Sequence, residues 1–268
     1  MRVPIYQIDA FTENVFGGNP AAICPLYTWL TDPTMQSIAA ENNLAETAFF
    51  VPDETGEADF HLRWFTPVHE VDLCGHATLA SSALIFDDLM PDREEISFRT
   101  RSGILRVRRD GDYYVMNFPS YPPTKRDVPK GLFEALGTEP VALYHAPQEE
   151  ERDRLMAVYE NEDQIRAIVP DMGGLKKLPT VSVIVTAPGW QVDFVSRYFA
   201  PNGGIDEDPV TGSNHCLLIP YWADRLGKKE LLGRQISARG GELKCSLKGD
   251  RVEMAGKAAR YLSGHIEI

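Results

Sequence analysis

The chain has 268 residues, 43% of them hydrophobic, and carries a formal net charge of -12 at pH 7. A chain of this length and composition buries one large core or two modest ones, which excludes a disordered protein. The negative charge argues against a nucleic-acid partner, because proteins that bind phosphate backbones carry basic patches. We therefore expect a globular protein with a small-molecule ligand.

The cysteines and the apolar segments indicate where such a protein works. The four cysteines show neither CxxC pairing nor the histidine spacing of a zinc site, so we expect free thiols in a reducing compartment. Residues 1–20 contain no apolar core of a signal peptide, and no apolar run approaches the length of a membrane span. We expect a cytoplasmic protein with no membrane partner.

Alternating apolar residues predict a series of strands in the first half, with one helix among them. The helix spans residues 32–43, with Thr31 or Asp32 as its N-cap and Pro33 at its first position. The expected strands are residues 6–11, 21–24, 44–51, 60–65, 96–101, 104–108 and 113–118. Turn-forming pairs such as Ser-Gly and Asp-Gly separate the later strands.

The most unusual stretch of the sequence surrounds Gly75. Polar residues end at His76, and residues 77–86 are small or apolar without a single charge. A helix with no charged face has to be enclosed by other elements, so we predict a buried central helix. Its N-terminus, near Cys74 and Gly75, offers free backbone N–H groups and the positive end of a dipole, both of which favour an anion.

An internal repeat relates the two halves of the chain. Residues 59–67 (DFHLRWFTP) resemble residues 193–201 (DFVSRYFAP), at an offset of 134 residues (193 minus 59). The same offset places the strand-like run that starts at Glu46 opposite one that starts at Thr180. Further along, Gly212 falls opposite Gly75. The sequence therefore indicates a tandem duplication.

The duplication predicts two similar lobes, each a curved sheet wrapped around its own central helix. We place the lobes at residues 1–122 and 123–268, because prolines cluster near this boundary. Pro220 lies inside the second central helix, where it removes a backbone hydrogen bond, so we expect a kink or an early end there.

Two equivalent helix N-termini predict a cleft between the lobes, in which amides near Gly75 and Gly212 hold a ligand carboxylate. The polar groups expected around this cleft are Asn19, Glu46, Cys74, His76, Asp206, Glu207, Asp208 and Ser213. Carboxyl groups enclosed in a cleft have raised pKa values, which suits proton transfer at carbon. Since no Rossmann, Walker or zinc pattern occurs, we predict no cofactor and no metal.

Five motifs, in order along most of the chain, resemble the phenazine biosynthesis PhzF-like proteins, which are relatives of diaminopimelate epimerase. They are DAFT with GNP in residues 9–20, NLAET in 43–47, RWFTP in 63–67, LCGHAT in 73–78 and EDPVTGS in 207–213. Together they are specific, where any one would be weak. The resemblance implies an α+β fold of two pseudo-symmetric lobes, each a rolled mixed β-sheet around a central helix.

The same resemblance implies a cofactor-independent isomerase that acts on a small carboxylate-bearing substrate, and a homodimer. It makes Glu46 the residue that moves a proton, with His76 and Asp208 as supporting acid/base groups. The residues that it implies for substrate binding are Asn19, Cys74, Gly75, Gly212 and Ser213.

Two departures from the family pattern leave alternatives open. Ala45 stands where many members carry serine, so one possible hydrogen bond to the substrate is missing. Racemising relatives use one cysteine per lobe, but the second lobe has Thr211 just before its glycine, where the partner of Cys74 is needed. A proton shuttle by Glu46 is favoured. The alternatives are an epimerase that uses Cys74 and a non-catalytic protein that binds small acids.

Overall fold

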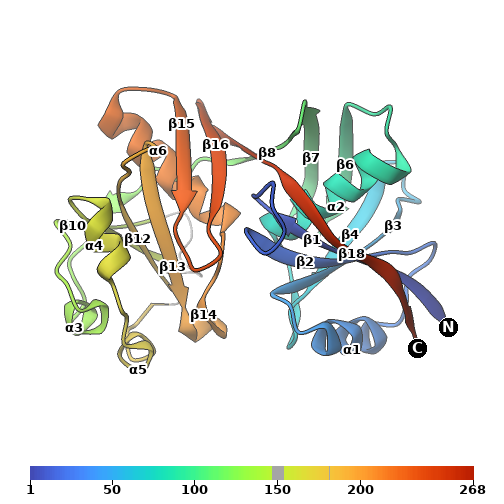
Figure 1. Ribbon diagram of the computed structural model, residues 1–268, viewed down its shortest axis with the longest axis horizontal. Helices are drawn as coiled ribbons and strands as arrows, with labels where there is room; N and C mark the ends of the chain where they lie inside the picture. Colours follow the sequence, from blue (N-terminus) through green and yellow to red (C-terminus); the bar gives the residue numbers. More distant parts are fainter. Residues whose placement is uncertain (147–153, 181) are drawn as a thin grey trace. The chain divides into compact units, whose positions relative to one another are not determined.

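The computed structural model describes residues 1–146, 154–180 and 182–268. It divides into two compact units, one formed by residues 1–117 with 254–268 and the other by residues 118–253. The predicted lobes differ from these units in the last segment. This segment belongs to the first unit because β18 (Ala258–Glu267) pairs antiparallel with β1 (Arg2–Ala10) along its whole length, as the red and dark blue strands of Figure 1 show.

The first unit is a mixed sheet with helices on its two faces. Its strands pair in the order β18-β1-β2-β3-β4-β6-β7-β8, and only the β2–β3 and β4–β6 pairs are parallel. The elements of this unit not yet given are β2 (Asn19–Pro25), α1 (Asp32–Asn42), β3 (Glu46–Pro52), β4 (Phe60–Phe65), β5 (Glu70–Val71), α2 (Gly75–Leu84), a π-helical turn (Ile85–Leu89), β6 (Glu95–Thr100), β7 (Gly103–Asp110) and β8 (Tyr113–Pro119).

The predicted helix of the first half is confirmed as α1. Thr31 is its N-cap and accepts a hydrogen bond from the Thr34 backbone N–H at 3.3 Å. Asn43 ends the helix in the left-handed conformation, at φ 49°. Met35 and Ile38 of α1 pack with Phe49 of β3 in a buried cluster, so α1 covers one face of the sheet.

The predicted buried helix is confirmed as α2, which packs against β1, β2, β3 and β18. Every residue from His76 to Leu84 is buried. The hydroxyl groups on this helix form hydrogen bonds within it. Thr78, Ser81 and Ser82 each donate to the backbone carbonyl four residues earlier, at 2.6 to 2.8 Å. A helix with serines can therefore be enclosed without leaving polar groups unpaired.

The second unit repeats the strand order of the first. The β11–β12 pair is parallel, β12–β13 antiparallel, β13–β15 parallel and β15–β16 antiparallel, which is the sequence of pairings that runs from β2 to β7. Its elements are β9 (Thr124–Lys125), α3 (Leu132–Leu136), β10 (Ala142–His145), β11 (Arg154–Val158), α4 (Glu162–Ala167), α5 (Met172–Leu175), β12 (Ser182–Pro188), β13 (Phe194–Ala200), β14 (Ile205–Glu207), α6 (His215–Leu226), β15 (Glu230–Gln235), β16 (Gly241–Lys248) and β17 (Arg251–Gly256).

The strand pairing corrects one detail of the repeat. In β3, the residue paired with Phe65 directly follows Glu46, and in β12 the residue paired with Phe199 directly follows Ser182. Phe65 and Phe199 are the equivalent positions of the repeated motif. The counterpart of Glu46 is therefore Ser182 and not Thr180, because the loop before β13 is shorter than the loop before β4.

Of the two outcomes expected for the second central helix at Pro220, a kink or an early end, the early end is wrong. Helix α6 runs through Pro220 to Leu226 and ends at Gly227, which adopts the left-handed conformation. Proline has no N–H for the carbonyl of Cys216, four residues earlier. That carbonyl instead accepts a hydrogen bond from the backbone N–H of Tyr121 at 2.8 Å. Because the carbonyl has another donor, the helix does not have to stop.

Among the described residues, no helix is long and apolar enough to span a membrane.

The tight turn before β2 generates a prediction about stability. Gly18 has φ +59°, and a Cβ built on it would lie 2.0 Å from the carbonyl oxygen of Ala10. We expect Gly18→Ala to lower the free energy of unfolding by more than the roughly 1–2 kcal/mol that a left-handed alanine costs. Urea denaturation measures this. The control is Gly111→Ala, at φ +58° with no atom within 4 Å, which should show the conformational cost alone. Equal losses in both variants would contradict the prediction.

Candidate active site

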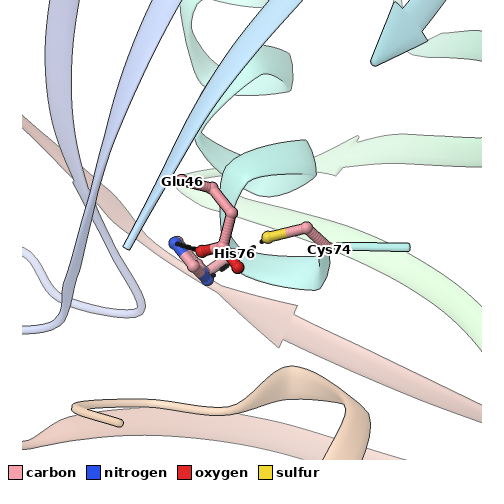
Figure 2. A group of neighbouring side chains, drawn as sticks. All are labelled: Glu46, Cys74 and His76. Atoms are coloured by element: carbon pink, nitrogen blue, oxygen red, sulfur yellow. Dashed lines mark hydrogen bonds and ion pairs between the residues drawn. The ribbon is translucent and has the colours of Figure 1, made fainter. Parts of the chain in front are cut away.

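A group of polar side chains gathers where two parallel strands and the central helix of the first unit begin. Strands β2 and β3 lie side by side and parallel, with Ala21 paired to Glu46, so Asn19 and Glu46 start their strands at the same edge. Helix α2 packs on both strands and starts with Cys74 as its N-cap. Figure 2 shows the Glu46, Cys74 and His76 side chains turned toward one another at this point.

The imidazole of His76 is the centre of the group. Its Nε2 lies 3.2 Å from Oε2 of Glu46, and its Nδ1 lies 3.2 Å from the amide nitrogen of Asn19. The sulfur of Cys74 is 3.5 Å from the same Nδ1. Three of the residues implied by the sequence therefore contact His76 directly, although 57 positions separate Asn19 from it.

Burial sets the charge state of this histidine. The side chain of His76 is 6% exposed, whereas that of Glu46 is 14% exposed. Removal from water disfavours the imidazolium and lowers the pKa of His76 to about 3. The ring is therefore neutral at pH 7, and it presents one N–H and one lone pair to its neighbours.

The donor atoms of Glu46, Cys74 and His76 lie within 4.8 Å of one another, close enough to reach a single metal ion. The fit is poor, however, because the carboxylate faces Nε2 whereas the thiol faces Nδ1. An ion bound at Nδ1 would displace the amide of Asn19, and one bound at Nε2 would have Glu46 beside it but the thiol at the other ring nitrogen. The amide of Asn19 is hydrogen-bonded to Nδ1, and the carboxylate of Glu46 lies at ion-pair distance from Nε2.

The loop before α6 holds the predicted residues of the second unit. Asp208 is buried and its carboxylate accepts a hydrogen bond from the Thr211 hydroxyl. Gly212 begins a short 3-10 turn, Gly212–Asn214, that leads into the helix, and Ser213 lies within it. The structure thus brings Asp208, Gly212 and Ser213 into one loop. Their predicted convergence with Glu46 on one cleft stays a prediction.

Two buried side chains that the sequence did not single out hold this loop. Gln235, at the end of β15, is fully buried, donates to the carbonyl of Asp208 at 2.6 Å and accepts from the Thr211 N–H at 2.9 Å. Arg154, at the start of β11, donates to the Ser213 hydroxyl at 3.2 Å and to the Asn214 amide oxygen at 2.8 Å. Both are distant in sequence from the loop, so no local motif marks them.

Comparison of the sequence with known proteins identifies the family of this chain. A family model described as phenazine biosynthesis-like protein matches residues 8–264. The chain belongs to this family. It is 48% identical over 268 residues, all of both chains, to a protein of Pseudomonas aeruginosa named an uncharacterized isomerase.

Solved structures agree with the family and the fold. A PhzF family protein of Enterococcus faecalis superposes with a TM-score of 0.94 at 44% identity, covering all of both chains. A predicted epimerase of Pseudomonas aeruginosa gives a TM-score of 0.72 at 20% identity, covering 98% of this chain and 99% of that one. The α+β, diaminopimelate-epimerase-like fold that the motifs implied is thereby confirmed.

The buried histidines generate a prediction about pH. Burial also lowers the pKa of His215 to about 4, and its Nδ1 lies 3.1 Å from the carbonyl of Thr211. An unfolded histidine has a pKa of about 6.5, so below that pH the unfolded chain binds protons that the native His76 and His215 do not. We expect acid to lower the free energy of unfolding by about 1.4 kcal/mol per pH unit for each of these histidines, between pH 6.5 and its native pKa.

Urea denaturation of wild type and His215→Gln at pH 7, 6 and 5 measures this dependence. The variant should show the shallower fall, by about 2 kcal/mol between pH 6.5 and 5. His69→Gln, at an exposed position, is the control. A wild-type and a His215→Gln curve of equal slope would contradict the prediction.

Proposed function

We propose that this chain is a cofactor-independent isomerase that moves a proton on a small carboxylate-bearing substrate, with Glu46 as the group that carries the proton. The observation that supports this most is the carboxylate of Glu46 held 3.2 Å from Nε2 of a buried, neutral histidine. The isomerase name of a relative that is 48% identical over the full length of both chains supports the same reaction class.

In the proposed isomerisation, Glu46 accepts a proton from one carbon of the substrate and returns it to another atom of the same substrate. A carboxylate has two oxygens, so Oε2 can remain beside Nε2 of His76 while the other oxygen accepts and returns the proton. The partial exposure of the Glu46 side chain, 14% against 6% for His76, supports access of a ligand to the carboxylate. No external base is then needed.

Each unit offers a helix N-terminus as a position for the substrate carboxylate. The first backbone N–H groups of α2, beginning at Gly75, have no partner within the helix, and the turn at Gly212 offers similar groups. Arg154 supports the second of these positions, because it holds the Ser213 hydroxyl and brings a positive charge to the start of α6. Asp208 is proposed as the second acid/base group on the strength of the family motif.

A second candidate is an epimerase in which Cys74 is one of two bases. The contact that favours it is the 3.5 Å separation between the thiol and Nδ1 of His76. Against it, the aligned position of the second unit is Thr211, whose hydroxyl is bonded to Asp208 and supplies no thiol. A two-base epimerase needs one base on each face of the carbon. We therefore rank the Glu46 shuttle first.

The test is exchange of solvent deuterium into a panel of amino acids, hydroxy acids and unsaturated acids, followed by mass spectrometry. Glu46→Gln keeps the shape but removes the carboxyl group that accepts and returns the proton, so it should lower turnover of the active compound by about 100-fold or more. Binding, measured by calorimetry, should change far less. Glu41→Gln, the same change at an exposed position of α1, is the control.

Two outcomes would contradict the proposal. Full turnover in Glu46→Gln together with loss of turnover in Cys74→Ala would assign the chemistry to the thiol. Binding of a small acid that is neither isomerised nor labelled with deuterium would indicate the non-catalytic alternative.

A further inference from the structure

The two ring nitrogens of His76 face partners of opposite character. Oε2 of Glu46, at Nε2, belongs to a carboxylate, which can only accept hydrogen bonds. The neutral ring has one N–H to give, so that N–H lies on Nε2. Nδ1 is then a buried lone pair, and it requires a donor.

Asn19 is the group that meets this requirement. Its amide nitrogen lies 3.2 Å from Nδ1, and the residue is fully buried. Its backbone is fixed as well, because Asn19 pairs with Ala10 in the β1–β2 ladder and follows the tight turn at Gly18. The Cys74 thiol, at 3.5 Å, is the weaker donor to the same atom.

We propose that Asn19 is a positioning residue, which holds His76 in the Nε2–H tautomer so that the Nε2–H group faces Glu46. This assignment differs from the ligand-contacting role that the family resemblance implied for Asn19. The tautomer is argued from the geometry of the first unit alone. Its effect on turnover rests on the proposed function.

The tautomer of His76 determines the separate roles of His76 and Glu46 in proton transfer. With its proton on Nε2, His76 stabilises the ionised form of Glu46, which is the form that removes a proton from carbon. The imidazole keeps its own proton while Glu46 changes between carboxylate and carboxylic acid. His76 therefore presents an N–H to the carboxylate at 3.2 Å, and the buried ring does not have to become charged.

Long-range proton–nitrogen NMR of protein labelled with 15N-histidine reads the tautomer directly. The chain has six histidines, and the signals absent from His76→Gln identify those of His76. In the wild type at pH 7 we expect Nε2 to be protonated and Nδ1 to be unprotonated. A wild-type proton on Nδ1 would overturn the proposal without any variant.

Asn19→Asp is the decisive variant, because it replaces the donor with a group of the same shape that only accepts. With a carboxylate at each nitrogen, His76 should become protonated on both nitrogens at pH 7, and turnover should fall by about 10-fold or more. The matched control is Asn42→Asp, which adds the same charge in the same unit, where the amide donates to Thr47 and not to His76.

The outcomes separate the two proposals. An unchanged His76 spectrum in Asn19→Asp, or an equal change in Asn42→Asp, would overturn the role of Asn19. The expected tautomer in a protein that exchanges no deuterium into any acid would leave the role of Asn19 standing and count against the isomerase.

Discussion

The first unit depends on one interaction, the contact between a buried neutral imidazole and a carboxylate at the start of a neighbouring strand. An ionised carboxylate is costly to bury unless a donor is nearby, and an imidazole is easily enclosed only when it is neutral. His76 and Glu46 face each other, with 3.2 Å between Nε2 and Oε2. The pairing is possible because β2 and β3 run parallel, which brings their first residues to the edge where α2 begins.

Much of the fold could be predicted because short sequence patterns determine it. The uncharged run after His76 predicted the buried helix, since no other environment accepts such a surface, and the repeated DF…F.P motif predicted the duplication. The exact counterpart of Glu46 could not be read from the sequence, because it depends on the lengths of two loops. Only the register of the strands shows that Ser182 occupies that position.

The candidate site could be predicted only to the extent that its residues lie in short motifs. Glu46, Cys74 and His76 were found in this way, and the structure places them together. Gln235 and Arg154 were missed because their contacts with the Asp208–Asn214 loop come from distant strands. The early end predicted at Pro220 failed for a related reason. The N–H group that bonds the freed carbonyl of Cys216 belongs to Tyr121, which is far away in the chain. Hydrogen bonds between distant segments leave no periodic trace in a sequence.

The position of β18 determines which of the two units has all its strands first during translation. The first unit takes strands from both ends of the described chain, whereas the second is built from the continuous residues 118–253. During synthesis, β1 is therefore exposed on one side until β18 emerges to pair with it. Domains usually fold in the order in which they are translated. Here translation completes the second unit first, because all of its residues precede β18, the strand that pairs with β1 in the histidine-bearing unit.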